Sequence, residues 1–156
     1  MFSLLPYIGM IVTALVCGLA FWRGGAPERV GAGLVLVVFL IGQLIDFIFP
    51  VGGKVSHLGQ VAHLGNDAFL AVGFLLVALR YGSLWLGGAM ILQAVQFSLH
   101  AFYLVVDRTR DTLFAVVNNL NTSGIILCIL AGALVAWRRR ARREAVQPAP
   151  AAAPAI

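Results

Sequence analysis

The side chains of this sequence that could do chemistry are few, and most of them lie inside long apolar stretches. Only 11% of the 156 residues are Asp, Glu, Lys or Arg, and the chain has three histidines. Because hydrocarbon solvates polar groups poorly, a polar side chain inside an apolar segment marks a functional site or a contact between helices. The sequence predicts a ligand-binding polar core, with most of its residues in the outer half of the membrane: Gln43, Asp46, Asn66, Asp67, Gln93, Gln96, His100, Tyr103, Asn118, Asn119 and Thr122.

One segment carries these polar groups at helical spacing. They recur at intervals of 3, 4, 3 and 4 residues: Gln93, Gln96, His100, Tyr103 and Asp107. At about 100° per residue they share one face of a helix, and that face should point into a bundle of helices. Because an unpaired carboxylate inside a membrane is costly, we expect Asp46 and Asp67 to meet near His100.

Three interpretations of the polar residues compete. In the first, the amides and His100 are structural and hydrogen-bond between helices. In the second, the polar residues line a cavity that opens to the outer side and binds a small polar solute, a proton or a cation, with His57 and His63 at its mouth. The third is a metal or haem enzyme, because His63 and Asp67 lie one helical turn apart. The candidate metal ligands are His57, His63, Asp67 and His100.

The elements that must position these residues are membrane-spanning helices. Apolar residues make up 61% of the chain and the mean hydropathy is +0.96, whereas a soluble domain is roughly 45–50% apolar. A helix needs about 17–25 apolar residues to cross the hydrocarbon. The sequence therefore predicts an all-α integral membrane bundle of about five transmembrane helices, with spans at 4–22, 30–49, 64–80, 84–106 and 113–137.

Glycine and proline mark the predicted breaks between these spans. Gly24 and Gly25 form a turn, and Pro27 suits the first turn of the next helix. Pro50 cannot extend the second helix. Asp111 is expected to cap the fifth helix through its side-chain oxygen.

The arginines predict the orientation of the bundle. With the C-terminus inside, the cytoplasmic segments hold eight basic residues: Arg23, Arg29, Arg80, Arg138, Arg139, Arg140, Arg142 and Arg143. The outer segments hold only Lys54, Arg108 and Arg110. Because Lys and Arg accumulate in cytoplasmic loops, we expect the N-terminus outside and the C-terminus inside.

The chain divides into a bundle over residues 1–137 and a cytoplasmic tail over 138–156. The tail begins with a basic cluster expected to contact anionic lipid headgroups: Arg138, Arg139, Arg140, Arg142 and Arg143. Its last part, from Gln147, is almost entirely Ala and Pro and is expected to be disordered. Because the basic residues gather in one tail, nucleic acid is not expected as a partner.

Two stretches resemble a family of small bacterial inner-membrane proteins for which no activity is established. From Trp22 to Ala32 the chain reads Trp-Arg-Gly-Gly-Ala-Pro-Glu-Arg-Val-Gly-Ala, which is similar to the first turn of that family. The stretch from Leu75 to Trp85 is similar to its later hairpin. The resemblance implies an inner-membrane location and a helical bundle, and it implies nothing about a substrate.

The sequence as a whole favours a non-enzymatic accessory or small-ligand-binding membrane protein. Motifs for a serine nucleophile, a phosphate-binding loop and a His-Glu-x-x-His metal site are all absent. The alternatives are a metal- or haem-binding membrane enzyme that uses His63, Asp67 and His100, and a proton or small-solute transporter or channel subunit. The sequence identifies no cofactor, and it leaves open a larger membrane complex or a homo-oligomer.

Overall fold

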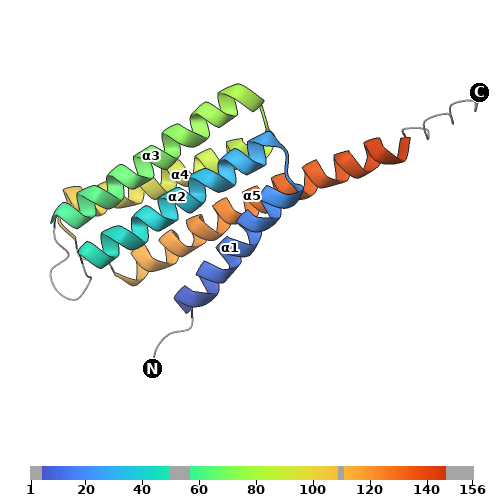
Figure 1. The fold of residues 1–156 in the computed structure, drawn as a ribbon. Helices are drawn as coiled ribbons and strands as arrows, with labels where there is room; N and C mark the ends of the chain where they lie inside the picture. The colour runs from blue at the N-terminus through green and yellow to red at the C-terminus, as the bar shows by residue number, and fades with distance from the viewer. Residues whose placement is uncertain (1–4, 50–56, 109–110, 147–156) are drawn as a thin grey trace, which may run out of the picture.

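The chain folds into five α-helices and, within the described residues, contains no strand (Figure 1). The structure is a computed structural model that describes residues 5–49, 57–108 and 111–146. The helices are α1 (Leu5–Arg23), α2 (Ala26–Ile48), α3 (His57–Tyr81), α4 (Leu84–Val105) and α5 (Thr112–Val146). The predicted all-α class is therefore confirmed.

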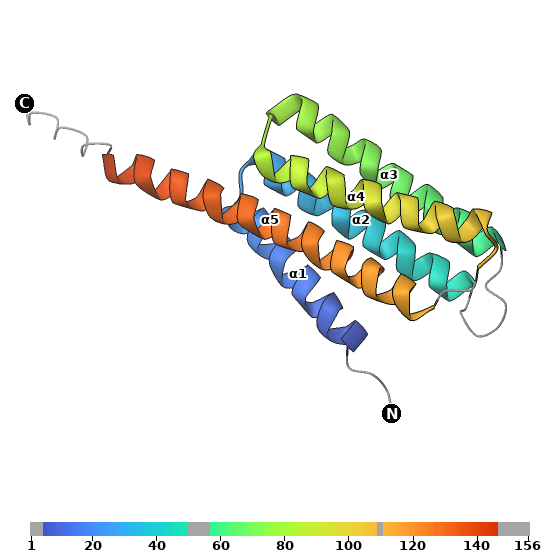
Figure 2. The same cartoon turned by 180° about the vertical axis from the view of Figure 1, so that it is seen from behind.

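Consecutive helices run in opposite directions, so the bundle has two ends of different character (Figures 1 and 2). Helices α2 to α5 pack as a four-helix bundle, and α1 packs on α5 and α2. At one end, α1 and α3 finish while α2 and α4 begin; we call it the arginine end. At the other end, α2 and α4 finish while α3 and α5 begin; we call it the histidine end.

The outer surface of the bundle is apolar along most of its length. Four helices (α2, α3, α4 and α5) are long and apolar enough to cross a membrane, and α1 is a shorter apolar helix. Large side chains such as Leu40, Leu76 and Ile91 are exposed on it. A soluble protein rarely exposes such large apolar patches, so this surface is suited to lipid. The chain is a multi-pass membrane-type bundle.

Three helices extend beyond the predicted spans. Helix α2 begins at Ala26 rather than at 30, because Pro27 suits a first helical turn and the Glu28 carboxylate accepts a hydrogen bond from the Gly25 N–H at 2.9 Å. Helix α3 begins at His57 rather than at 64. Helix α5 runs to Val146, past the predicted end of the span at 137, so the arginine cluster is helical. Arg, Ala and Glu are strong helix formers. The predicted disorder from Gln147 onward lies outside the described residues.

From its middle towards the arginine end, the bundle is closely packed with apolar side chains. Phe74 on α3, Leu86 on α4 and Ile129 on α5 have no exposed surface. Towards the arginine end, the Trp85 indole fills the space beside two glycines. A Cβ atom on Gly31 or on Gly132 would lie 2.6 Å from the nearest ring carbon of Trp85. Because only glycine leaves room there, the ring packs between α2 and α5, and its Nε1–H donates to Glu28 Oε1 at 3.0 Å.

Candidate functional site

Two carboxylate–imidazole pairs lie at the histidine end. Asp46, in the last turn of α2, places its Oδ1 atom 3.0 Å from Nε2 of His63, in the second turn of α3. Asp67, one turn further along α3, pairs through Oδ2 with Nδ1 of His100 on α4. Each pair joins two neighbouring helices, so three helices position the four side chains.

The two pairs are adjacent, and we call their four side chains the polar path. The imidazole rings of His63 and His100 stack, with their centroids 6.2 Å apart and an angle of 22° between the ring planes. The Asp46 side chain is 46% exposed, whereas those of His63, His100 and Asp67 are 16%, 11% and 12% exposed. The path therefore runs from an accessible carboxylate near the bundle end to a shielded carboxylate inside the bundle.

Gln93 closes the inner end of this path. Its Nε2 atom donates to the backbone oxygen of Asp67 at 3.1 Å and lies 3.4 Å from Asp67 Oδ1. The Gln93 side chain is fully buried. Beyond it lies the apolar layer around Phe74 and Leu86. The polar path therefore enters from the histidine end and stops at the middle of the bundle.

A second group of amides lies beside the two pairs. Gln96 donates through Nε2 to Asn118 Oδ1, and Asn66 donates to the backbone oxygen of Val38 at 2.9 Å. Three buried polar atoms in the described residues have no hydrogen-bond partner: Asn66 Oδ1, Gln96 Oε1 and Asn121 Nδ2. A buried polar group without a partner destabilises a fold. These three atoms therefore leave hydrogen-bonding capacity unused inside the bundle.

Asp111 ties the end of α4 to the start of α5. Its Oδ1 accepts hydrogen bonds from the Tyr103 hydroxyl at 2.6 Å and from the Phe114 N–H at 2.9 Å, and its Oδ2 pairs with Arg108 at 2.6 Å. The hydrogen bond from Tyr103 and that from the Phe114 backbone lower the pKa of the Asp111 carboxyl, and Arg108 adds to this. The predicted helix cap is confirmed. It also holds the Phe114 ring 5.1 Å from that of His100.

Most of the predicted core residues lie together, and the stripe on α4 faces inward as expected. Gln93, Gln96 and Tyr103 are buried and His100 is largely buried, whereas Asp107 lies past the end of α4 and is exposed. Other predicted residues are also exposed and form no hydrogen bond through their side chains: Gln43, Asn119 and Thr122. These three have the expected height but lie on outward faces of their helices.

The prediction that both aspartates meet near His100 is right for Asp67, whereas Asp46 pairs with His63. Sequence reasoning placed His63 at the mouth because it started α3 at residue 64, so it missed this pair. It also missed Phe114, whose apolar ring gave no signal. The four candidate metal ligands do not converge. His57 is exposed at the first residue of α3, and no group of three or more His, Cys, Asp or Glu side chains in the described residues is arranged to hold a metal ion.

Comparison of this chain with known proteins identifies no relative. No protein-family model, curated protein or solved structure matches this chain.

Proposed function

We propose that this chain is a non-enzymatic accessory protein of the bacterial inner membrane whose polar core binds and releases protons. The observation that carries the proposal is the two adjacent carboxylate–imidazole pairs, Asp46 with His63 and Asp67 with His100, whose imidazole rings stack. Imidazole is the side chain whose charge changes between about pH 5 and 8, and each ring here has a carboxylate as its partner. Ionisable groups inside a membrane protein commonly mark proton pathways.

The ends of the path support proton binding rather than proton conduction. Asp46 is the accessible group at which protons would enter and leave. The path stops at Gln93, and beyond it, towards the arginine end, Phe74, Leu86 and Ile129 are packed without exposed surface. A channel would need polar groups or water on both sides of that layer. A core that responds to the pH at one membrane face suits an accessory subunit.

The arginine distribution supports a placement with the histidine end outside. Eight described arginines lie at the arginine end or on the α5 extension beyond it, whereas Arg108 lies at the histidine end. By the positive-inside rule the arginine end faces the cytoplasm. The proton-binding path would then open to the periplasmic face, where the pH follows that of the surroundings.

Histidine NMR of the detergent-purified chain tests the proposal. Labelling of the imidazole carbons gives three signals, which can be assigned by His57→Gln, His63→Gln and His100→Gln. The signals are recorded from about pH 5 to 8, and we expect those of His63 and His100 to change together as a coupled pair. Asp46→Asn should alter the pH response of both buried rings and leave that of His57 unchanged.

Asp107→Asn is the matched control for that experiment. Asp107 is an exposed carboxylate at the same end of the bundle, and its side chain forms no hydrogen bond or ion pair. Its replacement should leave all three signals as they are in the unchanged chain. If the signals of His63 and His100 stay constant over this pH range, the core is a fixed clamp between helices and the proposal is wrong.

A further inference from the structure

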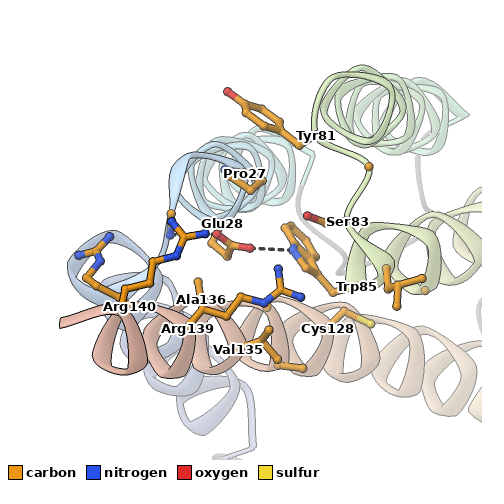
Figure 3. Close-up of a pocket in the computed structure, with 17 residues that line it drawn as sticks. Pro27, Glu28, Tyr81, Ser83, Trp85, Cys128, Val135, Ala136, Arg139 and Arg140 are labelled. Atoms are coloured by element: carbon orange, nitrogen blue, oxygen red, sulfur yellow. Dashed lines mark hydrogen bonds between the residues drawn. The ribbon is translucent and has the colours of Figure 1, made fainter. Parts of the chain in front are cut away.

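A pocket of about 930 Å³ lies at the arginine end, away from the polar core (Figure 3). It is bounded by the start of α2, the turn between α3 and α4, the first turns of α4 and one face of α5. Its volume is in the range of pockets that hold a small-molecule ligand. None of its lining residues takes part in the proposed proton path.

The outer part of the pocket is positively charged. Arg139, Arg140 and Arg143 line it, and in Figure 3 the first two lie on the same side of α5 as Glu28 and Trp85. Within the residues that the structure describes, no carboxylate pairs with these three guanidinium groups. The one acidic lining residue, Glu28, already accepts hydrogen bonds from the Trp85 indole and from the Gly25 N–H. The pocket therefore holds three positive groups and one carboxylate that already has hydrogen-bond partners. This net positive charge favours the binding of an anion.

The inner part of the pocket is apolar and formed by small side chains. Gly88 on α4 and the α5 residues Cys128, Ala131 and Ala136 line it. From Cys128 to Ala136 this apolar strip extends about 12 Å along α5. That length is close to half the thickness of the hydrocarbon core, which is about 30 Å in total. A small soluble anion would fill only the charged part, so the strip points to a ligand with an apolar chain.

Aromatic residues place this pocket at the level of a membrane surface. Trp22, Tyr81 and Trp137 are exposed at the arginine end, and the Arg23 guanidinium lies 4.2 Å from the Trp22 ring and 5.0 Å from the Trp137 ring. Trp and Tyr gather where the hydrocarbon meets the headgroups. The three pocket arginines lie two to six residues after Trp137, so they lie at headgroup level.

We infer that this pocket is a binding site for one anionic phospholipid. The phosphate of the headgroup lies among Arg139, Arg140 and Arg143, and an acyl chain runs along the strip from Ala136 to Cys128. Basic pockets between transmembrane helices are known to bind anionic headgroups. This is a specific site on one face of α5, distinct from a general attraction of the arginine cluster to lipid.

Native mass spectrometry of the detergent-purified full chain tests the site, with phosphatidylglycerol as the anionic lipid and phosphatidylcholine as the neutral one. We expect one phosphatidylglycerol to stay bound and phosphatidylcholine to dissociate. The double variant Arg139→Gln/Arg143→Gln should weaken the affinity by roughly fivefold per arginine removed. The matched control is Arg138→Gln/Arg142→Gln, which removes two arginines at the same spacing on α5 that do not line the pocket, and it should bind as the unchanged chain does.

Three further results separate the alternatives. If both double variants lose the lipid equally, the arginines act only as a diffuse charge and the inference is wrong. If inorganic phosphate in excess displaces the lipid and protects the chain against heat as well as the lipid does, the site belongs to a free anion and the inference is also wrong. If the pocket double variant does not fold, Ala131→Leu decides: it fills the apolar strip and leaves every arginine in place, and it must abolish binding.

Discussion

Gln93 holds the shielded end of the polar core through two contacts with Asp67. Its Nε2 atom donates to the backbone oxygen of Asp67 and approaches the carboxylate that pairs with His100. A polar contact between helices in a membrane contributes about 0.6 kcal/mol on average and up to about 1.7. Because Gln93 is fully buried and contacts the carboxyl group of Asp67, its contribution to stability should be at the upper end of this range.

Replacing Gln93 by Leu should therefore lower the free energy of unfolding by about 1.5 kcal/mol. The measurement is unfolding of the purified chain in mixed detergent micelles. Gln43→Leu is the matched control, because Gln43 is exposed on α2 and its side chain has no hydrogen bond. That control should leave the free energy of unfolding unchanged or raise it. Equal losses in the two variants would show that the contacts of Gln93 stabilise nothing.

Asp111 gives a second prediction at this scale, through its lowered pKa. A carboxyl whose pKa is lower in the folded chain than in the unfolded one stabilises the fold above its ordinary pKa of about 3.9. That stabilisation is lost as the pH falls through the lowered value, where the proton binds in both states. Asp111→Asn should thus lower the midpoint of thermal unfolding at neutral pH.

The gap in unfolding midpoint between the unchanged chain and Asp111→Asn should then close as the pH falls below about 4. Thermal unfolding at a series of pH values measures it. Tyr103→Phe should also lower the midpoint of thermal unfolding at neutral pH, because the Tyr103 hydroxyl is the main cause of the lowered pKa of Asp111. If the difference in unfolding midpoint stays constant down to acid pH, the Asp111 carboxyl does not stabilise the fold through a lowered pKa.

These residues also show how far sequence could predict the site. Helical spacing placed Gln93, Gln96, His100 and Tyr103 on one inward face because the pattern on α4 fixes both height and direction. The prediction of Gln43, Asn119 and Thr122 used only the depth of each residue in the membrane. Depth does not determine which face of a helix points inward. The pair of Asp46 with His63 depends on how α2 and α3 are rotated against each other, and a single sequence does not fix that rotation.

At the scale of the helices, the lengths were predicted where a breaker marks the end and missed where none does. Gly24 and Gly25 end α1 close to the predicted residue, and α4 begins at Leu84 as predicted. Helix α3 begins earlier than its apolar run because Gln60 and His63 are compatible with a helix when a neighbouring helix covers them. Helix α5 continues through the arginines because charge ends a membrane span but does not end a helix.

The packing of Trp85 between Gly31 and Gly132 gives a prediction for the helix contacts. A Cβ atom on Gly132 would lie 2.6 Å from Cδ1 of Trp85, which is too close for the rigid indole to stay in place. Adding a methyl group to a filled core costs about 1–3 kcal/mol. Gly132→Ala should therefore lower the stability by that amount and break the hydrogen bond from the indole to Glu28.

Fluorescence of Trp85 measures this change directly in a chain that carries Trp22→Phe and Trp137→Phe. We expect its emission to shift in Gly132→Ala as the ring leaves its site. Gly87→Ala is the matched control on α4, because a Cβ atom there meets nothing within 4 Å. Unchanged emission in Gly132→Ala would mean that α4 and α5 can separate without cost.

At the scale of the whole molecule, the two ends of the bundle are chemically opposed. The histidine end presents a carboxylate–imidazole path, and the arginine end presents a cationic pocket, with an apolar layer between them. Alternation of five helices assigns each end to one side of a membrane if all of them cross. The proton-binding proposal and the lipid site then belong to opposite faces, so the orientation of the chain decides which face each of them serves.

The orientation depends mainly on five arginines, and this makes it testable. The predicted cytoplasmic segments hold eight Lys and Arg residues and the outer ones hold three. Replacing Arg138, Arg139, Arg140, Arg142 and Arg143 by Gln leaves three on each side. Because the difference in basic residues sets the topology, the altered chain should insert in both orientations, whereas the unchanged chain should insert in one.

Cysteine labelling in a bacterial host measures both outcomes. The background carries Cys17→Ser and Cys128→Ser, and the reporters are Asp107→Cys at the histidine end and Tyr81→Cys at the arginine end, both exposed positions. A membrane-impermeant maleimide added to intact spheroplasts should label only the first reporter in the otherwise unchanged chain and both reporters after the five replacements. Labelling of Tyr81→Cys alone in the unchanged chain would reverse the orientation and place the proton path on the cytoplasmic face. In that case the core would respond to cytoplasmic pH, and the anionic lipid would come from the outer leaflet.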